Sequence, residues 1–85
     1  MRDFCVGGFV ISKAGHDKDA VYVVTDIQGD ILSLADGMTK TMANPKKKKT
    51  KHVMYTDTKL DCADGLTDEI IKLEVKKYCK TRAYA

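Results

Sequence analysis

The residues best suited to chemistry in this sequence are the lysines that follow Pro45. Five lysines fall within six consecutive positions, and His52 comes directly after them: Lys46, Lys47, Lys48, Lys49 and Lys51. With Lys40, the segment 38–56 holds six lysines and no acidic residue, so it carries +6, whereas the whole chain carries +3. The remaining residues together therefore carry −3. A cationic segment on an otherwise slightly acidic domain predicts a polyanionic partner, and nucleic acid is the first candidate.

A second group of polar side chains lies in the segment 13–19, between two predicted strands. Lys13, His16 and Lys18 are able to contact a phosphate, and His16 is also able to stack on a base or reach its edge. Asp17 is expected to shape the turn through its side-chain oxygen. An ordinary charged hairpin turn has the same composition, so both interpretations stay open for this segment.

The type of recognition follows from what accompanies the lysines. Lysine ammonium groups bind phosphates by charge and release counterions, which carries little sequence information. Tyr22 and Tyr55 are the candidates for stacking on a base, although half-buried core tyrosines are the favoured interpretation. We therefore expect recognition by shape and phosphate. The alternatives are a solvated lysine loop without a partner and, for His52, a plain strand-edge histidine.

The elements that must position these residues are strands joined by tight turns. Alternating apolar residues predict strands over 8–13, 20–27, 31–35 and 38–42, with a fifth over 52–55. The pairs Gly29-Asp30 and Asp36-Gly37 are typical of tight hairpin turns. Five short strands predict a mainly β fold, a small five-stranded antiparallel barrel whose closure removes exposed edges. The lysine run is expected as a loop before the fifth strand.

The last third of the chain has a different pattern. Residues 57–65 are polar, Thr67 is a predicted N-cap, and Asp68 and Glu69 suit a first helical turn. A helix is expected to run to about Cys79, with lysines near its C-terminal end: Lys76, Lys77 and Lys80. Its apolar residues form two stripes: Leu66, Ile70 and Leu73, and Ile71, Val75 and Tyr78. Such a wide apolar surface predicts packing on the barrel or on a partner. The chain thus divides into a barrel domain, 1–56, and a linker with a C-terminal helix, 57–85.

The order of short motifs resembles a known module. The run GFVISKAGHDK at 8–18, followed by YVV at 22–24, resembles a KOW motif, and more narrowly that of the large-subunit ribosomal protein family fourteen-e and its short bacterial relatives. The ADG turn at 35–37 and PKKKKTKH at 45–52 continue the match, which covers 6–53. The resemblance implies an SH3-like barrel that binds RNA, commonly ribosomal RNA or a translation-related partner. One position departs from the pattern, because Asp19 stands where the motif usually has a glycine, and aspartate tolerates left-handed backbone less well.

Two functions follow as expectations. The first is an RNA-binding protein that recognises structured RNA, with ribosomal RNA as the first candidate and with ribosome or translation-factor contacts. Its predicted contact residues are Lys13, His16, Lys18, Lys40, Lys46, Lys47, Lys48, Lys49, Lys51 and His52. The alternative is a protein-interaction module of a transcription or translation complex that uses the C-terminal helix, with Ile71 and Val75 as contacts. A homodimer through the helix is compatible with either function.

Other classes of protein have little support in the sequence. There is no G-x-S-x-G, P-loop or H-E-x-x-H pattern, so we expect no enzyme and no cofactor. Cys5, Cys62 and Cys79 are far apart and odd in number, which argues against a disulfide framework and against zinc. No apolar stretch is long enough to span a membrane, and the N-terminus lacks a signal-peptide pattern, so a cytoplasmic location is expected.

Overall fold

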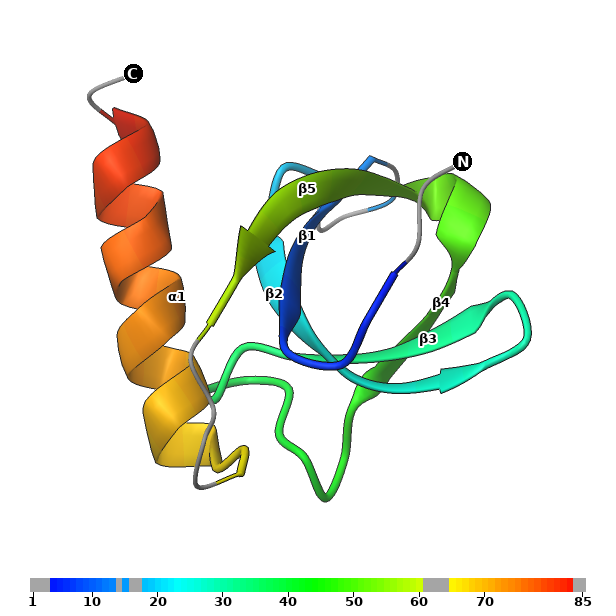
Figure 1. Ribbon diagram of the computed structural model, residues 1–85, viewed down its shortest axis with the longest axis horizontal. Coiled ribbons are helices and arrows are strands. Elements are labelled where there is room, and N and C mark those ends of the chain that lie inside the picture. Colours follow the sequence, from blue (N-terminus) through cyan, green and yellow to red (C-terminus); the bar gives the residue numbers. More distant parts are fainter. Residues whose placement is uncertain (1–3, 14, 16–17, 61–64, 84–85) are drawn as a thin grey trace.

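The computed structural model describes residues 4–13, 15, 18–60 and 65–83, the last four of these by their backbone alone. These described residues form five strands, a single 3-10 turn and one helix (Figure 1). They are β1 (Gly8–Ser12), β2 (Val21–Gln28), β3 (Ile31–Ala35), β4 (Lys46–Lys49), η1 (Thr50–His52), β5 (Val53–Lys59) and α1 (Asp68–Ala83). The prediction of a mainly β fold with one C-terminal helix is confirmed.

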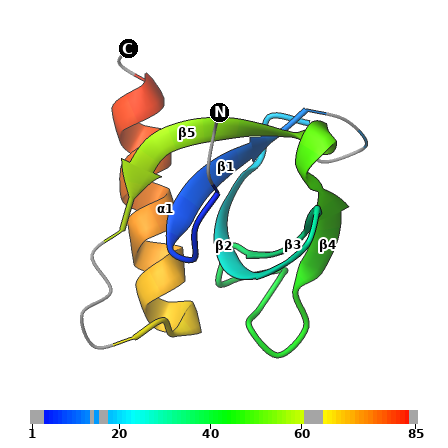
Figure 2. The ribbon, with the colours of Figure 1, turned by 45° about the vertical axis from the view of Figure 1, so that its right-hand side comes forward.

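The strands form one antiparallel sheet in the order β4-β3-β2-β1-β5. The sheet curls strongly, so that β4 and β5, which are joined through η1, lie at its two ends (Figure 2). Within the described residues no hydrogen-bonded ladder joins these two strands, and the closure that a barrel requires is not observed. A register shift around Thr25 in β2 contributes to the bending, as β-bulges do.

The concave face of the sheet, called the inner face below, holds one apolar core. Its buried side chains come from all strands except β4: Val10, Tyr22, Val24, Leu32, Leu34 and Val53. Phe4 packs against this core and lies edge-on to Tyr55, with ring centroids 5.5 Å apart and planes at 84°. The segment before β1 thus covers part of the inner core.

The convex face, called the outer face below, is covered by α1 over part of its extent. Ile71 and Val75 of the helix are buried against five residues of β1, β2 and β3: Phe9, Ile11, Val21, Val23 and Ala35. Tyr78 stacks on Phe9, with ring centroids 4.7 Å apart and planes at 9°. The helix therefore packs on its own sheet, which was one of the two predicted arrangements.

The start of α1 follows the prediction and its end does not. Thr67 Oγ1 accepts a hydrogen bond from the Ile70 amide at 3.2 Å, which is the capping contact expected of an N-cap threonine. The helix ends at Ala83 rather than near Cys79. The prediction stopped at the basic residues because they suit a final turn, but lysine and arginine are also good helix formers in the interior.

The largest error concerns the fourth strand. Residues 38–42, expected as a strand, form a compact loop, and the lysine run, expected as a loop, forms β4. The Asp36 carboxylate accepts hydrogen bonds from the amides of Met38 and Lys40, both 2.9 Å, and from the Thr39 hydroxyl at 3.0 Å. Amides bound to Asp36 cannot join a ladder, so the strand begins only after Pro45.

Candidate functional site

The lysines of β4 alternate between the two faces of the sheet. Lys46 and Lys48 lie directly opposite Leu34 and Leu32 of β3. Residues paired in this way share a face, and both leucines are fully buried in the inner core. Both lysines are half-buried, which places their methylene stems to lie on apolar surface. We infer that this inner pair of lysines covers the edge of the inner core.

The other two lysines of β4 belong to the outer face. Lys47 and Lys49 lie opposite Ser33 and Ile31, and both are exposed. Two residues apart on one strand, they are separated by about 6.7 Å along it. Asp26 lies opposite Ser33 and therefore shares their face, two strands away from Lys47, roughly 10 Å by the usual strand spacing. This outer pair of lysines is the part of the run that is open to a partner.

The turn η1 continues the basic surface toward β1. The Lys13 amide donates to the His52 carbonyl at 2.9 Å, and the Thr50 amide donates to the Asp30 carbonyl at 2.8 Å. The structure thereby brings Lys51 and His52, both exposed, beside Lys13, although nearly forty positions separate them in the sequence. The lysine run and the β1–β2 turn therefore form one surface.

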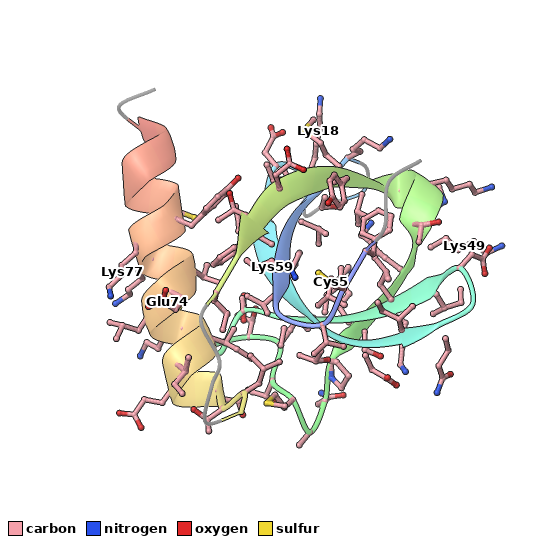
Figure 3. The ribbon with its side chains drawn as sticks, in the orientation of Figure 1. Cys5, Lys18, Lys49, Lys59, Glu74 and Lys77 are labelled. Carbon is pink, nitrogen blue, oxygen red and sulfur yellow. The ribbon has the colours of Figure 1, made fainter. Side chains whose placement is uncertain are left out.

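Lys18 extends this surface along the β1–β2 turn. Its side chain is exposed, and Figure 3 shows Lys18 and Lys49 at the rim of the sheet, away from α1. We call the exposed lysines of this region the lysine surface: Lys13, Lys18, Lys47, Lys49 and Lys51. His16 and Asp17, two residues predicted for the same turn, lie outside the described residues.

The departure at Asp19 has a structural consequence. Asp19 has φ of +71°, the left-handed backbone that glycine adopts more readily than aspartate does. Its amide donates to the Ser12 carbonyl at 2.8 Å and thus closes the turn. The side chain is exposed, so it adds a carboxylate close to the lysine surface.

Lys40, another predicted contact residue, lies apart from the lysine surface. It is half-buried in the β3–β4 loop, which lies against the start of α1 because the Met42 amide donates to Asp68 Oδ1 at 2.8 Å. Partial burial alone would raise the pKa of Asp36, but the hydrogen bonds from Lys40, Met38 and Thr39 outweigh it and hold that pKa below 3.8. Lys40 therefore belongs to the loop that holds the helix.

The tyrosines predicted as possible stacking residues are not available for that role. Tyr22 is 5% exposed within the inner core, and Tyr55 packs against Phe4. Neither of the two tyrosines therefore provides a stacking platform for a base. His52 is exposed beside Lys51, next to the lysine surface.

The alternation within β4 is the feature that sequence reasoning missed. Four identical residues show no hydrophobic period, so the run itself contains no signal for its two faces. The alternating leucines of β3 were visible, but the pairing of that strand with the lysine run was not.

The acidic, cysteine and histidine side chains of the described residues form no metal-binding cluster, since no three of them are placed to hold a metal ion. Cys5 and Cys79 are free thiols, half-buried and exposed respectively, and Cys62 is outside the described region. The helix α1, over its described length, is not apolar enough to cross a membrane.

Comparison with known proteins adds no relative to this picture. No family model and no curated protein matches the chain. The likeness to a KOW module therefore rests on the motifs themselves, and the function is argued below from the site.

Proposed function

We propose that this chain is an RNA-binding domain that recognises structured RNA, with ribosomal RNA as the first candidate, in translation or a ribosome-associated process. The observation that carries the proposal is the outward half of the lysine strand, Lys47 and Lys49, and its continuation through Lys51 to Lys13. This arrangement concentrates exposed ammonium groups on one rim of the sheet, away from α1. A phosphate backbone is the ligand whose charge density such a row complements.

The fold is part of the proposal. We infer that the curled five-stranded sheet is an SH3-like barrel of KOW type in which β4 and β5 approach each other through η1. Two observations support it: the enclosed inner core and the left-handed backbone at position 19.

Recognition rests on charge and shape. The lysine surface offers single point charges, which contact phosphates without reading bases. If all five exposed lysines neutralise a phosphate, the log–log salt slope approaches about −3.5, at ~0.7 per contact on single strands. The expected slope is smaller in magnitude than if every lysine of the basic segment contacted RNA. Lys46 and Lys48 are assigned to the inner face, and Lys40 lies apart from the lysine surface.

The experiment that tests the proposal compares two double variants with equal loss of charge. Lys47→Gln with Lys49→Gln removes the outer pair, and Lys46→Gln with Lys48→Gln removes the inner pair. Binding to a structured ribosomal RNA fragment is measured at several salt concentrations. The outer variant is expected to bind about tenfold more weakly at low salt, with a slope smaller by about 1.4.

The inner variant is the matched control. It is expected to keep the salt slope of the wild type within error, and to lose stability because neutral glutamine has a shorter apolar stem. Equal loss of binding in both variants would mean that only total charge matters. Undiminished binding by the outer variant would exclude the lysine surface as the RNA contact.

The alternative function loses its predicted contacts. Ile71 is 0% and Val75 is 5% exposed, because both are buried in the core that this chain forms with its own helix. A partner or a second copy bound at α1 would have to use the solvent side, where Leu73 is 55% exposed. No further observation favours that arrangement, and the homodimer stays a prediction.

A further inference from the structure

A groove lies between the end of β5 and the C-terminal half of α1, on a different side of the molecule from β4. Its cavity volume is about 290 Å³, and its lining comes from β1, β5 and the helix: Phe9, Thr58, Lys59, Glu74, Lys77 and Tyr78. Small-molecule sites start at about 300 Å³, so the groove suits a small ligand. It shares no residue with the lysine surface.

One wall of the groove is aromatic, and its accessible ring is that of Tyr78. Phe9 is 3% exposed and stacks almost parallel on one face of the Tyr78 ring, which fixes the orientation of the half-buried tyrosine. A tyrosine ring held in this way at a groove offers a polarizable surface of the kind that planar heterocycles prefer. These two rings are the only described aromatic side chains that pack between the sheet and the helix.

The rim of the groove is charged, with an excess of cations. Lys59 is exposed at the end of β5, and Lys77 lies on the helix with its Nζ 3.3 Å from Glu74 Oε2 (Figure 3). The lining holds two lysines and one glutamate, so its formal net charge is +1. The groove thus joins an aromatic wall to an anion-attracting rim.

We propose that this groove binds a nucleotide, with the base against the accessible part of the Tyr78 ring and the phosphate near Lys59 and Lys77. A nucleotide is the common biological ligand that combines a planar heterocycle with a phosphate at this size. An inorganic anion would not use the aromatic wall, and an uncharged heterocycle would not use the lysines.

The experiment titrates the full chain, labelled with ¹⁵N, with two probes. AMP carries base and phosphate, and ribose 5-phosphate carries the same phosphate without a base. We expect AMP to shift the resonances of Lys59, Lys77 and Tyr78 and to bind at least about tenfold more tightly than ribose 5-phosphate, because stacking requires the base. Equal binding of the two probes, or no shift at these residues up to millimolar AMP, would overturn the proposal.

Three single variants test the charges of the groove in opposite directions. Lys59→Gln is expected to weaken AMP binding about three- to fivefold, and Glu74→Gln to strengthen it by a similar factor. Lys76→Gln is the control, because this exposed lysine lies on the same helix outside the groove and should change binding less than twofold. If Lys76→Gln weakens AMP binding as much as Lys59→Gln, the site is only a diffuse basic face and the proposal fails.

A pair of blunt-ended RNA duplexes separates the two sources of the ligand. One duplex is fully paired, and the other carries a single bulged adenosine. Shifts at Lys59 and Tyr78 with the bulged duplex alone would assign the groove to an unpaired nucleotide of RNA, whereas shifts with AMP and neither duplex would assign it to a free nucleotide. The double variant Lys47→Gln with Lys49→Gln changes the lysine surface and leaves the groove intact. AMP binding by this variant therefore tests the groove independently of whether the lysine surface binds RNA.

Discussion

The outer face of the sheet has two parts that differ in what covers them. Over β1 and the first half of β2, the face carries large apolar side chains, and α1 packs on it. Over β4 and the neighbouring half of β3, the same face carries Ser33, which is 4% exposed, and the exposed side chains of Lys47 and Lys49. One continuous surface thus holds a covered apolar region and an open cationic region.

The difference shows how a small domain separates stability from binding. An 85-residue chain buries a limited fraction of its surface, so a second core under the helix adds substantial stability. The cationic region contributes little to folding on its outer side, and it is the region to which we assign the proposed binding of a polyanion. The β3–β4 loop joins the two regions, since it begins at the covered end of β3 and ends at the first lysine of β4.

The largest effect on stability is expected from a charged substitution in the covered region. Ile71→Asp places a carboxylate in the core between α1 and the sheet, where the side chain is fully buried. We expect a loss of more than about 4 kcal/mol in the free energy of unfolding, measured by urea denaturation. Leu73→Asp, on the exposed side of the same helix, is the control and should cost less than about 0.5 kcal/mol. Similar stability of the two variants would mean that the helix does not pack on the sheet in solution.

The next effect concerns the close approach of the β3–β4 loop to the helix. Gly37 has φ of +78°, and a Cβ there would overlap the Asp68 carbonyl oxygen and lie 2.6 Å from the Lys72 nitrogen. We expect Gly37→Ala to cost about 3 kcal/mol, from left-handed strain and overpacking together.

Gly29 provides the matched control for this substitution. It also has positive φ, +62°, but a Cβ there would meet nothing within 4 Å. Gly29→Ala should therefore cost only about 1 kcal/mol, from the backbone alone. Equal costs in thermal unfolding would contradict the tight contact between loop and helix.

The loop that joins the two regions also predicts a pH dependence. The pKa of Asp36 is held below 3.8 in the folded chain, so this carboxylate stabilises the fold above its unfolded pKa, and the contribution disappears as pH falls through the folded value. The difference in unfolding free energy between wild type and Asp36→Asn should be constant above about pH 5 and shrink below about pH 4. A difference that does not change with pH would show that the charge of Asp36 does not matter.

The smallest effects are expected from substitutions of Asp19, which lies close to the open cationic region. Asp19→Gly relieves left-handed strain and should stabilise the chain by up to about 1 kcal/mol, reduced by the extra freedom that glycine has when unfolded. Asp19→Asn removes the charge and keeps most of the geometry. If the carboxylate weakens RNA binding, both variants should bind more tightly by a similar small factor, whereas tighter binding by the glycine variant alone would point to the turn geometry.

The sequence was informative where a residue acts locally. The third strand was predicted with its observed bounds, and the first two were within one residue at each end, because β-branched and aromatic residues alternate there. Thr67 was identifiable as a cap because capping depends on the next three residues only.

Features that depend on distant partners were not predictable in the same way. Residues 38–42 have an alternating pattern typical of a strand, but Asp36 binds their amides. The lysine run has low strand propensity and becomes β4 through pairing with β3. The division of these lysines into an inner and an outer pair depends on the register of β4 on β3, because the run itself contains no alternating pattern. The contact between Lys13 and His52 likewise exists only once the sheet has folded.

The most direct test of the central claim is residue-resolved NMR mapping of a fully paired ribosomal RNA duplex on the ¹⁵N-labelled chain at low salt. We expect the amides of Lys13, Lys47, Lys49 and Lys51 to shift on binding. The amides of Val23 and Ala35 under the helix, and of Ile71 in the helix, should not shift. Shifts confined to α1, or spread evenly over the chain, would contradict the division of the outer face into a covered region and a binding region.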